Sequence, residues 1–187
     1  MNVKTLAISV ILLVMVSCDI ISSNSVQDNN ALSSAPYLTT DNTGLSITKA
    51  IIRTVHGNIE FKFYPIQAPT TVTRIIQLIK SDFYNGLTFF KVYPNFIIQT
   101  GDPTNTGKGG SGQKLKAEFN DIQHVKGTVA MARGQEVDSA DSQFYIALTT
   151  LSHLDKKYTV FGQVIKGLDI LEKITQNDKI LSISLKE

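Results

Sequence analysis

The chain has 187 residues, of which 42% are hydrophobic and 18% are charged, a length that suits one domain whose core needs no disulfide. Its single Cys excludes a disulfide framework and a cysteine-rich zinc site. The 18 basic and 16 acidic residues leave a formal charge of only +2. Nothing in this balance resembles the strongly basic face of a nucleic-acid-binding protein, so no nucleic-acid partner is expected.

The N-terminal residues 1–17 have the pattern of a signal peptide. Lys4 is their only charge, and an apolar stretch fills residues 6–16. This stretch is shorter than the about 20 residues that span a bilayer, but it fits a signal-peptide core. Cys18 follows at once, and the whole segment resembles a bacterial lipoprotein signal, although Met15 stands where that signal prefers Leu. The resemblance implies a lipid anchor at Cys18 on an extracytoplasmic membrane surface. An ordinary secretory signal with a chance Cys is the alternative.

The next segment, residues 19–45, changes character. It carries three Asp, no Lys or Arg, and many Ser, Asn and Thr, without a helical or strand period. This composition predicts a flexible tether. The sequence thus divides into a signal peptide at 1–17, a lipidated Cys with its tether at 18–45, and a folded domain at 46–187, which is expected to be a monomer.

The folded domain begins with a predicted hairpin. Ile59, Phe61 and Phe63 alternate with charged residues, which is the period of a half-buried strand. A turn around Gly57 separates this strand, at 59–64, from another at 47–55. Further strands are predicted at 87–92, 96–100, 127–132, 143–148, 159–165 and 180–185.

Two helices are predicted among these strands. The first covers residues 68–82, because Pro69 fits a first helical turn and an apolar stripe follows it. The stripe consists of Val72, Ile75, Ile76 and Ile79. The second, at 168–175, is short, with Ile170, Leu171 and Ile174 facing inward. Many short strands without a β-α-β rhythm favour an antiparallel barrel or sandwich.

Several motifs fail when their context is checked. Residues 107–112 satisfy G-x-G-x-x-G, but the dinucleotide fingerprint must open a helix inside a β-α-β unit. Residues 101–108 approach a phosphate loop with one residue too many between the glycines, and Gly109 follows where Ser or Thr must hold magnesium. Nucleotide binding is therefore excluded.

Other polar residues are expected to be structural. Ser152, His153 and Asp155 lie too close in sequence for a catalytic triad, and no nucleophile elbow is present. Lysines of the central loop are expected to form a solvated basic surface, and acidic residues there to be solvated carboxylates. The lysines are Lys108, Lys114 and Lys116, and the acidic residues are Glu118, Asp121, Glu136, Asp138 and Asp141.

Four stretches resemble the cyclophilins in order and separation. They are FFKVYPNFIIQTGDPTNTGKGGSG at 89–112, GTVAMAR at 127–133, SQFYIAL at 142–148 and LSHLDKKYTVFGQVIKGLDILEKI at 151–174. With the hairpin and first helix, the resemblance covers residues 46–187 and is strongest to the bacterial branch. It implies a mostly β fold, a closed eight-stranded antiparallel β-barrel capped by two helices. It also implies peptidyl-prolyl cis-trans isomerase (rotamase) activity without cofactor or metal, on proline-containing peptides and unfolded exported proteins.

The resemblance also assigns site residues. The proline pocket would be lined by Phe96, Ile97, Tyr145 and Leu154, with Ile97 where Met is usual and Tyr145 where Phe is usual. Gln99 falls at the glutamine that holds the substrate and the catalytic cation, and Gln143 at a second substrate contact. Ala132 and Arg133 match the edge that binds the substrate backbone, His153 falls where several members have Trp, and Tyr158 replaces a pocket His. Read singly, the apolar members of this set are equally consistent with ordinary core residues.

Lys91 is the departure with the largest consequence. The family places its catalytic Arg at this position, and Lys keeps the charge but loses the planar fork of donors. The sequence therefore predicts an isomerase that assists folding of exported proteins, with reduced activity. Two alternatives remain open: a proline-peptide binding module with little catalysis, and a surface lipoprotein that uses the fold as an interaction scaffold.

Overall fold

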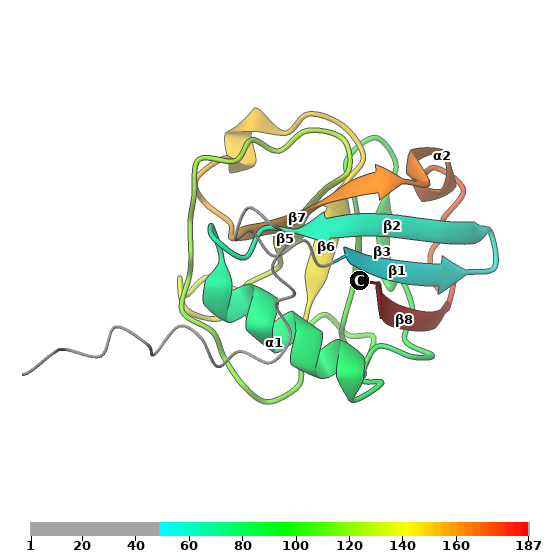
Figure 1. Cartoon of the computed structure of the whole chain (residues 1–187), viewed down its shortest axis with the longest axis horizontal. Helices are drawn as coiled ribbons and strands as arrows, with labels where there is room; N and C mark the ends of the chain where they lie inside the picture. The colour runs from blue at the N-terminus through cyan, green and yellow to red at the C-terminus, as the bar shows by residue number, and fades with distance from the viewer. Residues whose placement is uncertain (1–48, 187) are drawn as a thin grey trace, which may run out of the picture. The chain divides into compact units, whose positions relative to one another are not determined.

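The computed structural model of the chain describes residues 49–186 (Figure 1). The predicted signal peptide, Cys18 and the tether lie outside these residues. The strands are β1 (Lys49–Thr54), β2 (Gly57–Phe63), β3 (Lys91–Tyr93), β4 (Ile97–Thr100), β5 (Thr128–Met131), β6 (Phe144–Ala147), β7 (Val160–Lys166) and β8 (Ile180–Lys186). The helices are α1 (Pro69–Lys80), the four-residue α2 (Leu168–Leu171) and a 3₁₀ turn η1 (Ser152–Leu154). None of the helices within residues 49–186 has the length and apolar character needed to cross a membrane.

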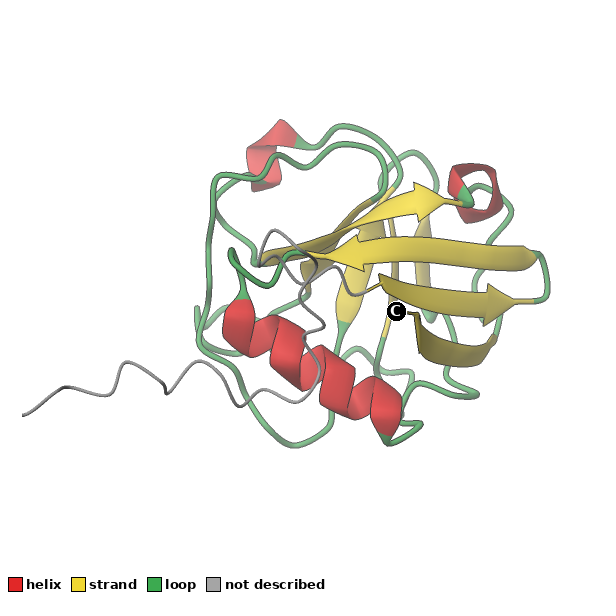
Figure 2. Ribbon diagram, in the orientation of Figure 1, coloured by secondary structure: helices red, strands yellow, loops and turns green. Residues whose placement is uncertain are grey.

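The strands form one curled antiparallel sheet in the order β3-β4-β6-β5-β7-β2-β1-β8 (Figure 2). The predicted closed barrel is corrected to an open half-barrel, because no ladder joins the edge strands β3 and β8. The segments that precede the two edge strands are joined instead by an isolated bridge between Thr88 and Lys179 and by neighbouring backbone hydrogen bonds. There the Phe89 N–H donates to the Asp178 carbonyl at 2.9 Å. Since residues 87–89 bond to residues 177–180, regular pairing with β4 begins only at Lys91.

The first hairpin is confirmed, although its second strand begins at Gly57, two residues before the predicted start. Lys49 to Thr54 pair with Lys62 to Gly57, and Gly57 has φ +130° at the turn. This left-handed region favours a residue without a Cβ. The alternation is confirmed too, because Ile59, Phe61 and Phe63 are buried.

Helix α1 packs through its apolar stripe, and a carboxylate distant in sequence caps its N-terminus. Val72, Ile75, Ile76 and Ile79 are all buried against the sheet, as predicted. No side chain of the helix's own N-terminus caps it. Instead the Glu118 carboxylate accepts the N–H groups of Thr70 and Thr71 at 2.9 and 2.8 Å. A carboxylate at a helix N-terminus satisfies donors that lack intrahelical partners and complements the helix dipole.

Helix α2 is shorter than the predicted 168–175. It ends at Leu171, and Asp178 closes a later turn by accepting the Thr175 N–H and hydroxyl at 2.6 and 3.0 Å. Leu171 and Ile174 are nevertheless buried, as the apolar pattern predicts.

The two faces of the sheet carry two separate apolar clusters. The larger one, on the inner face, joins α1 to inward residues of the strands and forms the core. The smaller one lies on the outer face of β4, β5, β6 and β7, because successive strand residues point to opposite faces. Its buried members are Ile97, Ala130, Tyr145, Ala147, Leu151 and Val160.

Candidate active site

A groove of about 740 Å³ opens over the outer cluster. It is lined by strands β3, β4 and β6 and by the loops that carry the glycine-rich run and residues 132–141. Every site residue predicted within residues 49–186 lines this groove except His153. These residues are Lys91, Phe96, Ile97, Gln99, Ala132, Arg133, Gln143, Tyr145, Leu154 and Tyr158.

The groove floor is apolar and its members support one another. Ile97 and Tyr145 are buried in the outer cluster, and Phe96, Leu154 and Tyr158 pack on it while partly exposed. The Tyr145 and Tyr158 rings meet edge to face with centroids 5.7 Å apart. Such a surface can take an apolar ring of a ligand, because its apolar atoms are already held in place.

His153 lies beside the groove rather than in it. Its ring stacks on Phe96 with centroids 6.0 Å apart and planes 9° apart. His153 therefore supports the outer side of a predicted pocket residue. Cys18, the predicted lipidation site, lies outside the described residues.

A chain of amide hydrogen bonds crosses the polar end of the groove. Gln99 Nε2 donates to Gln143 Oε1 at 2.9 Å, and Gln143 Nε2 donates to the Gly109 carbonyl at 2.7 Å. Lys91 pairs with Gln99 in the β3–β4 register, so the two side chains share one face. The Lys91 ammonium lies 6.0 Å from the Phe90 ring centroid and forms no hydrogen bond or ion pair with a described residue. Lys91 and Gln99 are thus adjacent, but Gln99 donates to Gln143 and leaves its own carbonyl oxygen for a donor.

The glycine-rich loop is held by the buried carboxylate of Asp102. Its oxygens accept the N–H groups of Thr104, Thr106, Gly107 and Gly109 at 2.6 to 3.2 Å. Burial would raise the pKa of Asp102, but hydrogen bonds from Thr104, Gly109 and Gly107 hold it below its ordinary value. A Cβ added at Gly109 would overlap Asp102, so only glycine allows this approach. The loop serves as a groove wall, consistent with the exclusion of nucleotide binding from its sequence.

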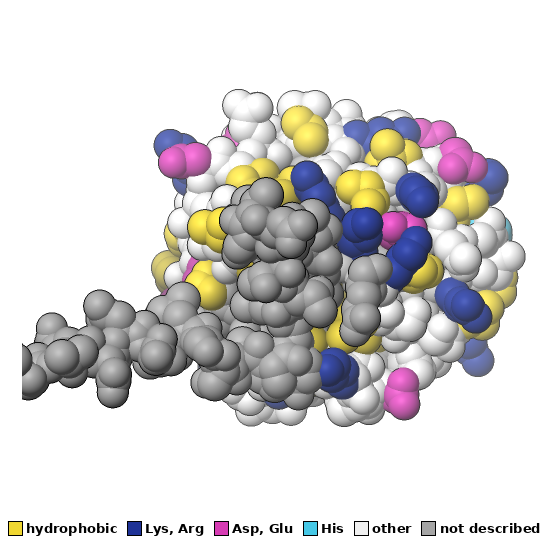
Figure 3. Space-filling view, in the orientation of Figure 1, with side chains coloured by type: hydrophobic (Ala, Val, Ile, Leu, Met, Phe, Trp, Pro, Cys, Tyr) yellow, Lys and Arg dark blue, Asp and Glu magenta, His cyan; other side chains and the backbone are white. Residues whose placement is uncertain are grey.

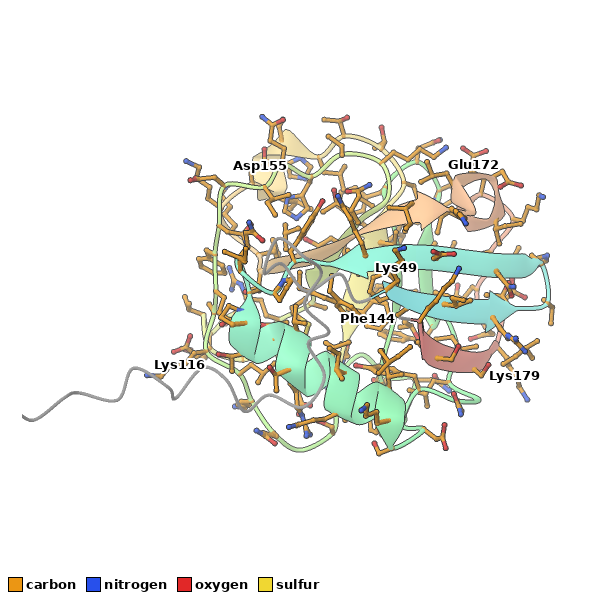
Figure 4. The ribbon with its side chains drawn as sticks, in the orientation of Figure 1. Lys49, Lys116, Phe144, Asp155, Glu172 and Lys179 are labelled. Atoms are coloured by element: carbon orange, nitrogen blue, oxygen red, sulfur yellow. The ribbon has the colours of Figure 1, made fainter. Side chains whose placement is uncertain are left out.

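Behind the floor, Tyr145 is anchored by a buried histidine. His124 is 0% exposed, and its Nε2 lies 2.9 Å from the Tyr145 hydroxyl. Its Nδ1 lies 2.9 Å from Asp155, which also accepts the His124 backbone N–H at 2.8 Å. These bonds hold the pKa of Asp155 below its ordinary value, while burial raises the pKa of Tyr145. Figure 4 places Asp155 at the periphery beside the 3₁₀ turn, so the chain of bonds runs from the surface to the groove floor.

The edge predicted to bind a substrate backbone is partly engaged by the protein itself. The Ala132 N–H donates to the Gln143 carbonyl at 2.9 Å. The Arg133 guanidinium donates to the carbonyl of Lys157 at 3.1 Å and lies 5.0 Å from the Tyr158 ring centroid. Arg133 therefore fixes the groove wall and brings a positive charge to it.

Comparison with known proteins agrees with this geometry. Residues 49–184 match the family described as cyclophilin type peptidyl-prolyl cis-trans isomerase/CLD. The chain belongs to this family. As a cyclophilin it is an isomerase, a peptidyl-prolyl cis-trans isomerase.

Relatives and solved structures match about three quarters of the chain of this cyclophilin. A peptidyl-prolyl cis-trans isomerase of Synechococcus elongatus is 38% identical over 141 residues, which is 74% of this chain and 97% of the relative. One from Helicobacter pylori is 40% identical over 138 residues, 72% of this chain and 84% of the relative. The crystal structure of a Cryptosporidium parvum cyclophilin, obtained in the presence of the dipeptide Ala-Pro, has a TM-score of 0.70 at 29% identity. It covers 74% of this chain and 99% of its own.

Several loop carboxylates of this cyclophilin, which the sequence predicts to be solvated, form structural hydrogen bonds. Asp141 accepts the N–H groups of Ser111 and Gly112 at 2.8 and 2.9 Å, and Asp138 accepts the Ala117 N–H at 2.9 Å. Like Glu118, they tie loops together instead of facing only water. Their partners lie 21 to 48 residues away, so no local pattern marks them. Within residues 49–186 no group of three or more His, Cys, Asp or Glu could hold a metal ion.

Proposed function

We propose that this cyclophilin accelerates X-Pro isomerisation with Lys91 as its catalytic cation, at a lower rate than an Arg at this position would give. The observation that carries the proposal is the position of a cation at the polar end of an apolar groove. Phe96, Ile97 and Tyr145 would hold the proline ring. Gln99 and Gln143 would contact the substrate amides.

The chemistry needs a donor more than a nucleophile. An X-Pro bond rotates over tens to hundreds of seconds, because the partial double bond gives a barrier of about 18–20 kcal/mol. Catalysis must stabilise the twisted amide over both planar forms. In the twisted state the nitrogen gains a lone pair that an ammonium N–H can meet. Lys91 can supply that N–H, and the Gln99 carbonyl oxygen next to it can hold the ammonium in place.

The reduced rate follows from the shape of the side chain. A guanidinium offers a rigid fork of donors, one for the substrate and others for Gln99, whereas an ammonium is a point charge on a flexible stem. Lys91 forms no hydrogen bond with a described residue that would fix its position. The cation is therefore present but poorly oriented.

The test compares the parent chain with Lys91→Arg and Lys91→Ala in an X-Pro peptide isomerisation assay. Loss of one well-placed donor costs about 3 kcal/mol at oxyanion-type sites, which is about a hundred-fold in rate. Lys91→Ala removes a less well oriented donor, so it is expected to lower kcat/KM about ten-fold. Lys91→Arg is expected to raise it several-fold. Lys116→Ala is the matched control, because Lys116 is exposed and does not line the groove. A parent and Lys91→Ala of equal activity would remove Lys91 from the mechanism.

A binding module with little catalysis is the second candidate. The observation in its favour is that Lys91 has no hydrogen-bond partner among the described residues that would hold its ammonium beside Gln99. The same assay separates the two candidates. A parent that binds the peptide without accelerating exchange, while Lys91→Arg does accelerate it, identifies the binding module.

We further propose that the substrates are exported proteins and that a lipid at Cys18 holds the enzyme at an extracytoplasmic membrane surface. The support is the apolar run at residues 6–16, which is followed after Ser17 by the chain's only Cys. The bacterial branch is supported by Arg133 and Tyr158, which match its variants of the groove. Labelled fatty acid should enter the expressed chain and not Cys18→Ser. A Cys18→Ser chain that still takes up the label would contradict the anchor. A surface scaffold role would instead be indicated by protease access to the protein on intact cells.

A further inference from the structure

The half of the sheet away from the groove carries a row of lysines. In the strand register Lys186 of β8 faces Lys49 of β1, and Lys49 faces Lys62 of β2. Directly paired residues of an antiparallel ladder point to the same face. Paired Cα atoms lie about 5 Å apart, so these three side chains arise within about 10 Å.

A fourth lysine extends this row, and one carboxylate lies within it. Lys166 of β7 pairs with Glu60 of β2. Glu60 is 7% exposed and lies 3.5 Å from the Lys186 ammonium and 3.7 Å from that of Lys166. We call the four lysines Lys49, Lys62, Lys166 and Lys186 the basic face. Figure 3 shows Lys and Arg side chains gathered around an acidic group over β1 and β2.

Folding gains little from this arrangement. Like charges placed directly opposite on neighbouring strands repel each other and destabilise the pairing. Within residues 49–186, Lys49 and Lys62 form no ion pair, and the Lys62 ammonium lies 5.3 Å from the centroid of the Tyr64 ring. A single partly shared carboxylate leaves most of the charge uncompensated. An external anionic surface would remove the repulsion.

We propose that the basic face binds a membrane surface that contains anionic phospholipids. Lys49 directly follows the 48 residues that include the apolar run and Cys18, so the face begins where the chain leads back to the predicted anchor. One lipid chain alone holds a protein weakly, and a polybasic patch supplies the second attachment. Groove residues lie on β3, β4 and β6 or nearby loops, so this contact leaves the groove available to peptides.

The test uses the chain from residue 18 onward with Cys18→Ser, so that no lipid contributes to binding. Sedimentation with vesicles of phosphatidylglycerol and phosphatidylcholine is compared with vesicles of phosphatidylcholine alone. We expect binding only to the anionic vesicles, and weaker binding as salt rises. Each Lys near such a surface adds about five-fold in affinity, so the triple variant Lys49→Glu, Lys62→Glu, Lys186→Glu should bind at least a hundred-fold more weakly.

The matched control reverses the same number of charges elsewhere. Lys108→Glu, Lys114→Glu, Lys116→Glu changes the exposed loop beside the groove and gives the same net charge. This control should bind vesicles about as well as the parent. If the Glu triple folds poorly, the uncharged triple Lys49→Gln, Lys62→Gln, Lys186→Gln replaces it in the comparison. Glu60→Gln should strengthen binding, because it removes the carboxylate from the face.

Three outcomes would overturn the proposal. The first is that the parent does not bind anionic vesicles. The second is that both triple variants lose binding equally, which would show that net charge alone determines binding. The third is that a duplex oligonucleotide binds through the basic face while vesicles do not. Isomerisation of a soluble X-Pro peptide by the basic-face triple should match that of the parent. This readout separates failure of membrane binding from failure of the proposed catalytic function.

Discussion

The inner and outer faces of the same strands differ in what covers them. On β6, Phe144 and Ile146 point into the core, while Tyr145 and Ala147 point into the outer cluster. Figure 4 shows Phe144 in the interior between α1 and the sheet. The inner face is covered by the protein's own helix. The outer face is surrounded by loops and left open as the groove.

This difference separates stability from function. The Phe144 ring meets Tyr84 and Phe161 edge to face at 5.5 and 6.0 Å, a closed contact in which all members are buried. On the outer face the apolar residues support only one another and the groove rim, and their polar neighbours hold loops in place. Substitutions on the inner face should therefore change unfolding, and those on the outer rim should change ligand binding.

The largest expected effect is that of Phe144→Ala. Removing a buried Phe leaves a cavity and costs about 3–5 kcal/mol of unfolding free energy. Leu154→Ala, on the half-exposed groove rim, should cost about 1 kcal/mol or less but weaken X-Pro peptide binding. Urea unfolding and peptide titration of both variants measure the contrast. If Leu154→Ala unfolded as readily as Phe144→Ala, the groove wall would belong to the core and the two faces would not be distinct.

A smaller effect is expected from Tyr145→Phe, which tests the buried support of the outer face. The change keeps the ring on the groove floor but leaves His124 Nε2 without its partner at a fully buried position. An unpaired buried polar group costs about 1–3 kcal/mol. Peptide affinity should change little, because the apolar surface remains.

Tyr158→Phe is the control for this prediction. Tyr158 lies on the same wall, edge to face with Tyr145, but its hydroxyl forms no hydrogen bond with a described residue. The unfolding free energy of the Tyr158→Phe variant should stay near that of the parent. Equal stability of all three proteins in urea would show that His124 is satisfied without the Tyr145 hydroxyl.

Much of the fold could be predicted from the sequence because its signals are local. The period of two in residues 59–64 and the apolar stripe from Val72 to Ile79 predict β2 and α1 to within a few residues. The late start of β3 and the open sheet could not be predicted in this way. They depend on bonds such as Phe89 N–H to the Asp178 carbonyl, 89 residues along the chain, which no window of sequence contains.

The same distinction holds for the candidate site. Its groove residues were reached through several motifs in one register, and the structure places all of them except His153 along the groove. His124 was missed because a lone His carries no pattern and its partner Asp155 is 31 residues away. Asp102 did have a signal, since Asp followed by Pro, Thr and Asn is turn chemistry in which the carboxylate accepts nearby N–H groups.

The smallest expected effect concerns the pH dependence of the groove loop. The pKa of Asp102 is below its ordinary value in the folded protein, so its unfolded state binds a proton at higher pH than its folded state does. Its contribution to stability is therefore complete above about pH 4, the ordinary carboxyl pKa, and is lost as pH falls through the lower folded value. Asp102→Asn removes this contribution at every pH, because the Asn NH2 group is a donor and cannot accept a hydrogen bond from an N–H group such as that of Gly107.

The urea midpoint of Asp102→Asn should thus be lower than that of the parent at pH 7, and the gap should narrow at pH 3. Glu136→Gln is the control, since Glu136 is exposed and its carboxylate forms no hydrogen bond or ion pair with a described residue. A gap that stays constant from pH 7 to pH 3 would mean that the loop is held without the charge of Asp102. In that case the outer face, like the core, would be held by packing, and the distinction between the two faces would lie in exposure alone.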